Sequence, residues 1–325
     1  MTPLLVPVAV LSGIGIVMAA LLAVGRKAFA VEVDERQEKL MDILPGANCG
    51  GCGYAGCSGY AAALVKGEAK PTLCPPGGAD LAGEIGVIMG VEVEDMPDMV
   101  ALVACAGDDK LAPERSSYLG VQTCAAAHAV AGGMKKCTHG CLGLGSCVEA
   151  CPFGAIVITD HNLAVVVPEL CTGCAQCVAT CPRNIIKLVP GSEKVHVLCH
   201  NPDKAKATKA VCSVGCTGCK LCAKQSKRFM IDGALAAVDP EGKGEIPADA
   251  PLVCATGSIY DGRLYTMTAW TTDAAAREER DKKSEEWKES EKARKAALKA
   301  AKKAAKEKKA KEKAESDGGQ EGGSA

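Results

Sequence analysis

The chain has 325 residues, of which 20 are cysteine and only 3 % are aromatic. So few aromatic side chains argue against a large aromatic-rich enzyme core, and the cysteine content indicates that covalent or coordinate bonds hold much of the fold. The net charge of -1 hides an asymmetry, because residues 277–313 carry 16 basic and 9 acidic side chains, which leaves an acidic body. An acidic body argues against binding of nucleic acid.

The N-terminal residues 3–24 are apolar and uncharged, and Arg26 and Lys27 follow them directly. As a helix this segment would extend roughly 33 Å, enough to cross the hydrocarbon core of a membrane. The positive-inside rule then predicts a single-pass anchor over residues 1–27, with the N-terminus outside and the rest of the chain in the cytoplasm. A cleaved signal peptide is the alternative, although its basic residues normally precede the apolar run. Because stable disulfides are rare in the cytoplasm, the predicted topology favours metal ligation by the cysteines.

The first cysteine group has the spacing C-x2-C-x4-C-x16-C and lies in a glycine-rich stretch without histidine. A [4Fe–4S] cluster needs one thiolate for each iron, and a tight loop can supply three of them. Zinc sites more often use paired C-x2-C motifs or histidines. We therefore predict one [4Fe–4S] cluster in a small domain over residues 28–95, with a short helix at 58–65. The predicted ligands are Cys49, Cys52, Cys57 and Cys74.

Two further cysteine groups interlock, and each ends in Cys-Pro. The later group is the C-x2-C-x2-C-x3-C-P run of bacterial ferredoxins, in which the fourth cysteine binds the other cluster. This exchange predicts two clusters in a ferredoxin-like module over residues 96–192, with short strands at 156–158 and 165–167. The predicted ligands of one cluster are Cys137, Cys141, Cys147 and Cys181, and those of the other are Cys151, Cys171, Cys174 and Cys177.

A fourth cysteine group aligns with the second group without a gap, which indicates an internal duplication. In this alignment Cys219 takes the place of Leu144, and Ser226 takes the place of Cys151. Because Ser226 is not a thiolate and Ala255 replaces the usual proline, we predict a degenerate ferredoxin-like module over residues 193–270 with one cluster. Its predicted ligands are Cys216, Cys219, Cys222 and Cys254; in the alternative, Cys254 is a bystander and Cys212 completes the site.

Four cysteines stay outside these predicted sets. They form either a fifth cluster or inert thiols that pack as small apolar groups. We expect four [4Fe–4S] clusters, within a range of three to five. The four candidate extra ligands are Cys105, Cys124, Cys199 and Cys212.

The rest of the sequence carries no other chemistry that we can identify. It has no G-x-G-x-x-G motif after a strand, no P-loop and no nucleophile triad, so we predict no catalytic residue. Residues 271–325 form a tail rich in Lys, Ala and Glu, which we expect to be partly helical and otherwise disordered. The predicted fold class is therefore α+β: an anchor helix, a small cluster domain, tandem ferredoxin-like modules and a charged tail.

The stretches ILPGANCGGCGYAGC, CLGLGSCVEACPFGAI and CTGCAQCVATCP, together with the N-terminal apolar segment, resemble the B subunit of the Rnf complex in its long form. The resemblance covers about residues 1–265. Rnf is a membrane-bound, ion-translocating ferredoxin:NAD oxidoreductase. The resemblance implies a subunit in the cytoplasmic membrane of a prokaryote that passes electrons from soluble reduced ferredoxin to membrane and flavin-bearing partner subunits. In that family NAD reduction and ion transport depend on other subunits, so this chain is not expected to hold a complete active site.

Two other classes of function remain as alternatives. One is a structural zinc protein or membrane scaffold, and the other is a membrane-anchored polyferredoxin that serves a different reductase, such as a corrinoid activator. Docking of an acidic ferredoxin on an acidic body is unexpected, so we look for a local basic patch. The candidate patch is Lys204, Lys206 and Lys209.

Overall fold

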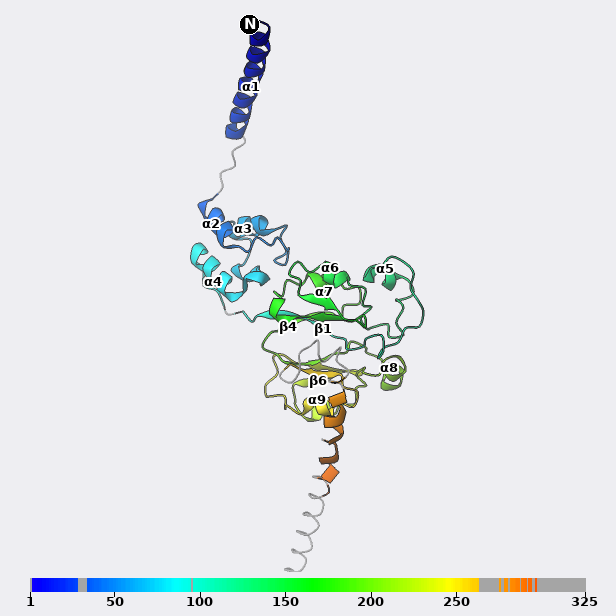
Figure 1. Ribbon diagram of the computed structural model, residues 1–325. Coiled ribbons are helices and arrows are strands. Elements are labelled where there is room, and N and C mark those ends of the chain that lie inside the picture. The colour runs from blue at the N-terminus through cyan, green and yellow to red at the C-terminus, as the bar shows by residue number, and fades with distance from the viewer. Residues whose placement is uncertain are drawn as a thin grey trace, which may run out of the picture. The chain divides into compact units, whose positions relative to one another are not determined.

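The computed structural model describes residues 2–28, 34–94 and 96–262, together with short helical stretches between residues 275 and 296 (Figure 1). The chain divides into two compact units. The first unit comprises residues 1–73 and 80–94, and the second comprises residues 74–79 and 95–325. The predicted tail beyond residue 296 lies outside the described residues.

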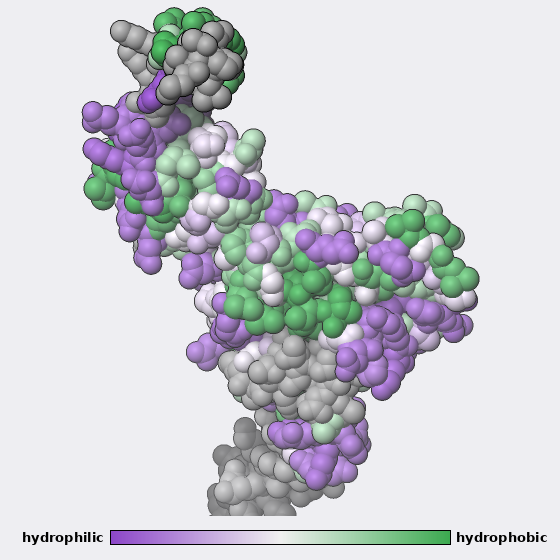
Figure 2. All heavy atoms as spheres, turned by 45° about the horizontal axis from the view of Figure 1, so that its top comes forward, coloured by the Kyte–Doolittle hydropathy of each residue, from purple (hydrophilic) through white to green (hydrophobic). Residues whose placement is uncertain are grey.

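Helix α1 comprises Thr2–Ala28. Its described apolar side chains are exposed, among them Leu11, Ile16 and Leu22, and they appear in green at the top of Figure 2. Within the described part of the chain, no helix combines the length and the hydropathy that crossing a membrane requires.

The remainder of the first unit is helical. Helix α2 (Glu35–Ile43) begins where the side chain of Asp34 accepts a hydrogen bond from the backbone N–H of Arg36, which satisfies a free donor of the first turn. Helix α3 (Cys57–Val65) buries Tyr60, whose hydroxyl donates to the carbonyl of Lys70 at 2.8 Å. The helix predicted at 58–65 is thus confirmed to within one residue. The 3₁₀ turn η1 (Pro71–Leu73) and helix α4 (Gly78–Met89) follow.

In the second unit, residues 99–190 form what we call the first repeat. Its first strand β1 (Met99–Val103) pairs antiparallel with its last strand β4 (Ile186–Pro190), and the hairpin of β2 (Ile156–Ile158) and β3 (Ala164–Val166) lies between them in sequence. The strands predicted at 156–158 and 165–167 are confirmed, the second with a shift of one residue. Figure 1 shows α6 and α7 on the same side of the β1–β4 pair. The helices and turns are α5 (Cys124–Ala129), α6 (Ser146–Glu149), η3 (Pro168–Leu170) and α7 (Gln176–Thr180).

Residues 195–261 form the second repeat, which has the same plan. Strand β5 (Val195–Val197) pairs antiparallel with the last strand β8 (Ile259–Asp261), and β6 (Phe229–Asp232) and β7 (Leu235–Val238) form the hairpin between them. The duplication that the sequence predicts therefore recurs in the strand pairing. The helices and turns are α8 (Ala205–Val211), η4 (Cys222–Lys224) and α9 (Ala250–Val253).

The two repeats pack against each other through an apolar cluster that includes Leu102, Leu198 and Tyr260. The backbone also joins them, because the N–H of Ala106 donates to the carbonyl of Leu198 at 3.2 Å. Each repeat has its own small core of Ile, Val, Leu and Ala, and cysteines form part of both cores. The structure thus has mixed α and β content, and every cysteine after Cys74 lies inside the repeats or where they meet.

Candidate metal centres

The first cysteine group lies in a glycine-rich loop that precedes α3. The backbone has positive φ at several of its residues, including Asn48 (47°) and Gly56 (131°). The side-chain oxygen of Asn48 accepts the N–H of Cys57 at 2.9 Å, and a Cβ on Gly56 would lie 2.7 Å from that oxygen. Only glycine fits there, so the loop is held in one shape. Cys74 is buried and precedes the 3₁₀ turn η2 (Pro75–Gly77) of the second unit. The loop carries Cys49, Cys52 and Cys57, all half-buried.

Cavity A lies inside the first repeat and has an empty volume of about 370 Å³. Burial, together with the neighbouring thiolates, raises the pKa of Cys147 to about 12. The cavity differs from the predicted ligand set by one residue, because Cys137 does not line it and Cys124 does. The N–H of Cys124 donates to Oγ of Ser146 at 2.9 Å, which attaches the start of α5 to the start of α6. The cysteines that line cavity A are Cys124, Cys141, Cys147 and Cys181.

Cavity B is a second cavity of the first repeat and has an empty volume of about 310 Å³. Two backbone N–H groups donate to its sulfurs: that of Ala101 to Cys171 at 3.3 Å and that of Ala155 to Cys151 at 3.4 Å. Burial, and after it the thiolates of the other three cysteines, raises the pKa of Cys177 to about 11. The structure brings together here all four predicted ligands of one cluster, Cys151, Cys171, Cys174 and Cys177.

Site D lies in the second repeat. Burial, and then the nearby thiolates of Cys254, Cys216 and Cys219, raise the pKa of Cys222 to about 11. Cys254 Sγ accepts the backbone N–H of Ser258 at 3.2 Å, and Cys151 Sγ accepts that of Ala155 at 3.4 Å. In both cases the donor lies four residues after the cysteine. The two cysteine turns are therefore built alike, although Ala255 replaces proline in one of them. The cysteines of site D are Cys216, Cys219, Cys222 and Cys254, of which Cys219 is exposed.

Cavity C lies where the two repeats meet and has an empty volume of about 330 Å³. It contains Cys137, which the spacing assigns to another site, and three cysteines that the spacing leaves unassigned. The spacing pairs Cys199 with Cys124, because each precedes its group by the same distance, but in the structure Cys105 and not Cys124 joins Cys199 in this cavity. The cysteines that line cavity C are Cys105, Cys137, Cys199 and Cys212.

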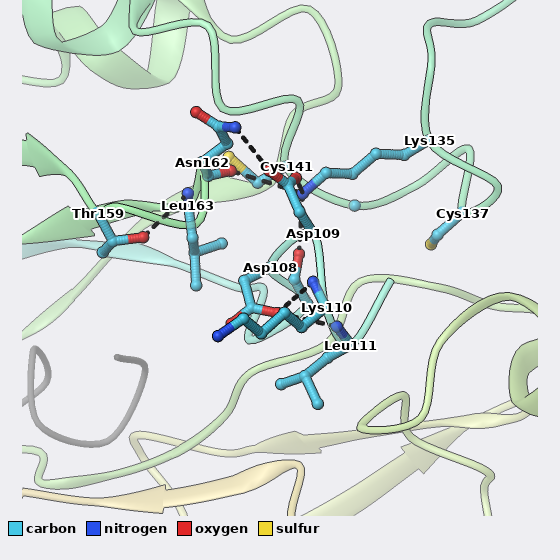
Figure 3. A network of polar contacts seen from close by, with 12 residues as sticks. Asp108, Asp109, Lys110, Leu111, Lys135, Cys137, Cys141, Thr159, Asn162 and Leu163 are labelled. Atoms are coloured by element: carbon cyan, nitrogen blue, oxygen red, sulfur yellow. Dashed lines mark hydrogen bonds and ion pairs between the residues drawn. The ribbon is translucent and has the colours of Figure 1, made fainter. Parts of the chain in front are cut away.

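Two buried cations lie beside these cavities. Lys135 is fully buried; its Nζ forms an ion pair with Asp109 at 3.3 Å and donates to the carbonyl of Gly107 at 3.2 Å (Figure 3). Arg183 is 7 % exposed and donates to the carbonyl of Cys137 at 3.0 Å. Burial lowers the pKa of Arg183, and the nearby cysteines oppose this shift. Buried charges are rare unless they are paired. Lys135 has Asp109 as its partner, whereas among the described residues Arg183 donates to backbone carbonyls, so its surroundings are suited to a neighbouring anionic group.

Cavities A and B are lined by cysteine and no histidine, which suits iron–sulfur ligation, whereas His139 and His200 lie beside the four cysteines of cavity C. In the described residues, no group of three or more His, Cys, Asp or Glu side chains is close enough to hold a single metal ion. A cubane of four irons and four sulfides is larger than one ion, so its four cysteine ligands stand farther apart than those of a single metal ion.

Comparisons with known proteins agree with this chemistry. A family model for an Fe–S cluster matches residues 44–76, and a model for a 4Fe-4S dicluster domain matches residues 135–186. The first range contains the whole first cysteine group, and the second contains cysteines of cavities A, B and C. These matches confirm the prediction of [4Fe–4S] cofactors.

Three curated relatives are B subunits of ion-translocating complexes. The chain is 44 % identical over 213 residues to the B subunit of a Na⁺-translocating ferredoxin:NAD⁺ oxidoreductase complex from Acetobacterium woodii, which covers 66 % of this chain and 64 % of that protein. It is 40 % identical to the B subunit of an ion-translocating oxidoreductase complex from Methanosarcina acetivorans, over 72 % of this chain and 89 % of the relative. It is 39 % identical to the B subunit of a proton-translocating ferredoxin:NAD⁺ oxidoreductase complex from Clostridium ljungdahlii, over 64 % and 73 %.

Proposed function

Because the chain belongs to the family of B subunits of ion-translocating oxidoreductase complexes, we propose that it is the electron-transfer subunit of such a complex. It receives electrons from reduced ferredoxin and passes them to partner subunits, and the complex couples this transfer to NAD reduction and ion translocation. The observation that carries the proposal is the series of cysteine-lined cavities in the first repeat and where the two repeats meet. The alternative of a polyferredoxin for another reductase is not favoured, since the relatives are subunits of these complexes.

Four sets of cysteines are proposed to hold [4Fe–4S] clusters. In cavity A, Cys124 replaces Cys137 as the fourth ligand. The duplication supplies the reason, because Leu144 stands where the second repeat has Cys219, and Cys124 packs in the same small cluster as Leu144. The proposed ligands are Cys49, Cys52, Cys57 and Cys74; Cys124, Cys141, Cys147 and Cys181; Cys151, Cys171, Cys174 and Cys177; and Cys216, Cys219, Cys222 and Cys254.

The chain's own residues fix the position and the electrostatic surroundings of these groups. When bound, [4Fe–4S] clusters accept and release single electrons over a wide range of potentials. Backbone N–H groups such as those of Ala101, Ala155 and Ser258 donate to ligand sulfurs and so favour the more negative state. Small apolar side chains around the cavities keep water away from them.

A single-pass membrane anchor over residues 1–27 is part of the proposal. The uncharged residues 3–24, with Arg26 and Lys27 after them, support it. Extraction of native membranes with alkaline carbonate tests the anchor: the full-length chain should stay in the membrane and a chain without residues 1–27 should not. Protease added from the cytoplasmic side should then remove the body. Release of the full-length chain by carbonate would contradict the anchor.

Partners follow from the same proposal. Membrane and flavin-bearing subunits would take the electrons, and soluble reduced ferredoxin would deliver them. The exposed lysines in and just before α8 support a ferredoxin docking site on an otherwise acidic body: Lys204, Lys206 and Lys209.

Anaerobic purification of the full chain tests the proposed function. The protein should be brown, should contain iron and acid-labile sulfide in equal amounts, and should bleach when reduced ferredoxin is added. A structural zinc protein would instead contain zinc, no iron and no visible absorption. Zinc without iron, or clusters that reduced ferredoxin does not reduce, would overturn the proposal.

A further inference from the structure

Cavity C receives two cysteines from each repeat. Cys105 (8 % exposed) and Cys137 (6 %) come from the first repeat, and Cys212 (9 %) and the half-buried Cys199 come from the second. Its empty volume of about 330 Å³ lies between the 310 Å³ of cavity B and the 370 Å³ of cavity A. Cavity C therefore has the same number of thiols and similar room to the two sites already proposed in the first repeat.

The four cysteines occupy equivalent positions in the duplicated chain. Cys105 and Cys199 each follow the first strand of their repeat, β1 and β5. Cys137 and Cys212 each lie four residues before a cysteine that belongs to the repeat's own site. The pairs Cys105–Cys137 and Cys199–Cys212 are thus two copies of one structural element. The two pairs face each other across the contact between the repeats, so together they supply four thiols to one site.

The sulfurs of cavity C accept hydrogen bonds that follow the same duplication. Sγ of Cys105 accepts the backbone N–H of Gly107 and that of Cys141, each at 3.4 Å. In the second repeat, the residues at the two equivalent positions are Asn201 and Cys216. Burial raises the pKa of Cys199, and the backbone N–H groups of these two residues oppose that shift. An N–H group that points at sulfur stabilises a thiolate, and this is the form that binds iron.

Two glycines leave the space in front of the sulfurs open. A Cβ on Gly107 would lie 3.2 Å from Sγ of Cys212 and 3.7 Å from Sγ of Cys105. A Cβ on Gly140 would lie 3.5 Å from Sγ of both Cys105 and Cys137. Neither glycine has a positive φ, so the backbone conformation does not require glycine at these positions. At Gly107 the Cβ of Ala112, 2.9 Å away, also excludes a side chain, whereas at Gly140 the nearest atoms are the two sulfurs.

The two buried cations lie next to this cavity. Lys135 donates to the carbonyl of Gly107, and Arg183 donates to the carbonyls of Cys137 and Gly140, all residues that line cavity C. The Nε of Arg183 is buried without a hydrogen-bond partner among the described residues. A cluster held by four thiolates carries negative charge, which would offset the charge of Arg183, a residue that also lines cavity A; Lys135 already has Asp109 as its partner.

We propose that Cys105, Cys137, Cys199 and Cys212 bind a fifth [4Fe–4S] cluster that bridges the two repeats. The inference rests on the proposed function, because it takes the cofactor to be the same. The cluster would arrive by thiol exchange from a carrier that holds it through thiolates. Each of the four cysteines forms one iron–sulfur bond, one iron–thiolate bond to the carrier breaks, and the proton of the cysteine passes to the departing thiolate, with no change of oxidation state. With this cluster, all 20 cysteines of the chain have a ligand role.

The double variant Cys199→Ala/Cys212→Ala of the full chain tests the proposal. The iron content should fall by about four per chain from about twenty, and one EPR signal of the reduced protein should disappear while the others persist. Ser213→Ala, an exposed neighbour, is the control and should keep all its iron. Buried thiols with a packing role alone would lower the melting temperature and leave the iron unchanged. An unchanged iron content in the double variant would overturn the proposal.

A second measurement covers the case in which the double variant does not fold. Native mass spectrometry of the unmodified, anaerobically purified chain counts the clusters directly. Five clusters are expected. Four clusters would reject the site in cavity C while leaving the proposed function intact, whereas a chain without any iron would reject both.

Discussion

The backbone N–H of Cys141 donates to Sγ of Cys105 at 3.4 Å. Cys141 lines cavity A and Cys105 lines cavity C, so the two cavities share a wall. In the second repeat burial raises the pKa of Cys199 of cavity C, and the backbone N–H of Cys216, a residue of site D, opposes this shift. Cavity C thus lies directly beside one site of each repeat, where a bound cluster would connect the two.

This position predicts magnetic coupling between the bridging cluster and its neighbours. In the fully reduced chain, EPR signals of adjacent clusters should be broadened by spin–spin interaction. The Cys199→Ala/Cys212→Ala variant should show sharper signals from the clusters in cavity A and site D. Ser213→Ala should keep the broadening. Equal linewidths in the double variant and the unmodified chain would contradict the arrangement.

Lys135 is predicted to raise the reduction potential of the group in cavity C. Reduction adds negative charge, which a fully buried cation beside Gly107 stabilises. Lys135→Met should lower the potential by roughly 60 mV, which is a tenfold change in the equilibrium constant of a one-electron couple. An EPR-monitored redox titration of the full chain measures this shift. The exposed neighbour Lys136 is the matched control, and Lys136→Met should leave the potential unchanged.

Cys124 and Cys137 are predicted to serve different clusters. Cys124→Ala should remove or convert the cluster in cavity A, with a loss of about one to four irons, because one of four thiolates is missing. Cys137→Ala should instead affect cavity C. EPR spectra of the two variants, each with its iron content, should therefore lose different signals. If Cys124→Ala kept all its iron, Cys124 would not be a ligand, and the result would favour Cys137 as the fourth ligand, as the sequence alone predicts.

The sequence predicts the short-range structure well and the long-range contacts poorly. The helix α3 and the strands β2 and β3 follow from local patterns, and each is predicted to within one residue. Strand β1 escapes prediction, because its partner β4 lies roughly 80 residues farther along the chain. Such pairing depends on the packed repeat and not on the strand's own sequence.

For the ligand sets too, the sequence predicts the local groups of cysteines but not the contacts between distant segments. Spacing alone predicts the third cysteine group, and the structure brings its cysteines to one cavity with Cys151. The structure places Cys124, and not Cys137, on the wall of cavity A, and the spacing does not predict this. Leu144 marks a missing ligand in the duplication, but only the fold, through the hydrogen bond from Cys124 to Ser146, brings α5 to that place.

Replacing Gly143 by alanine is predicted to destabilise the first repeat more than replacing Gly154 by alanine. Both have positive φ, 78° and 63°, so alanine costs about 1 kcal/mol at either position. At Gly143 a Cβ would also lie 2.1 Å from the carbonyl oxygen of Asn162, whereas nothing lies within 4 Å at Gly154. The clash should add on the order of 2 kcal/mol or more. Thermal unfolding of the anaerobic chain should show a drop of about 3 °C for Gly154→Ala and at least twice that for Gly143→Ala. Similar melting temperatures would show that the loop can move away.

The basic patch at α8 is predicted to steer ferredoxin toward cavity C. Lys204, Lys206 and Lys209 are exposed, and Thr208, between the last two, lines cavity C. Reversing their charge to glutamate should slow electron entry from reduced ferredoxin roughly tenfold at low salt, because attraction becomes repulsion. The difference should shrink as added salt shortens the screening length. Stopped-flow bleaching of the full chain measures the rate.

A control with the same change in net charge separates docking from a general effect. Lys224, Lys227 and Lys243 are exposed lysines elsewhere in the second repeat, and their reversal to glutamate should slow electron entry much less. If both triple variants were slowed equally, the effect would belong to the overall charge of the acidic body. If neither were slowed, ferredoxin would dock on another surface, and the exposed Cys219 of site D would then mark the next region to examine. A loss confined to the α8 variant would identify cavity C as the first electron acceptor, since Thr208 of that helix lines it.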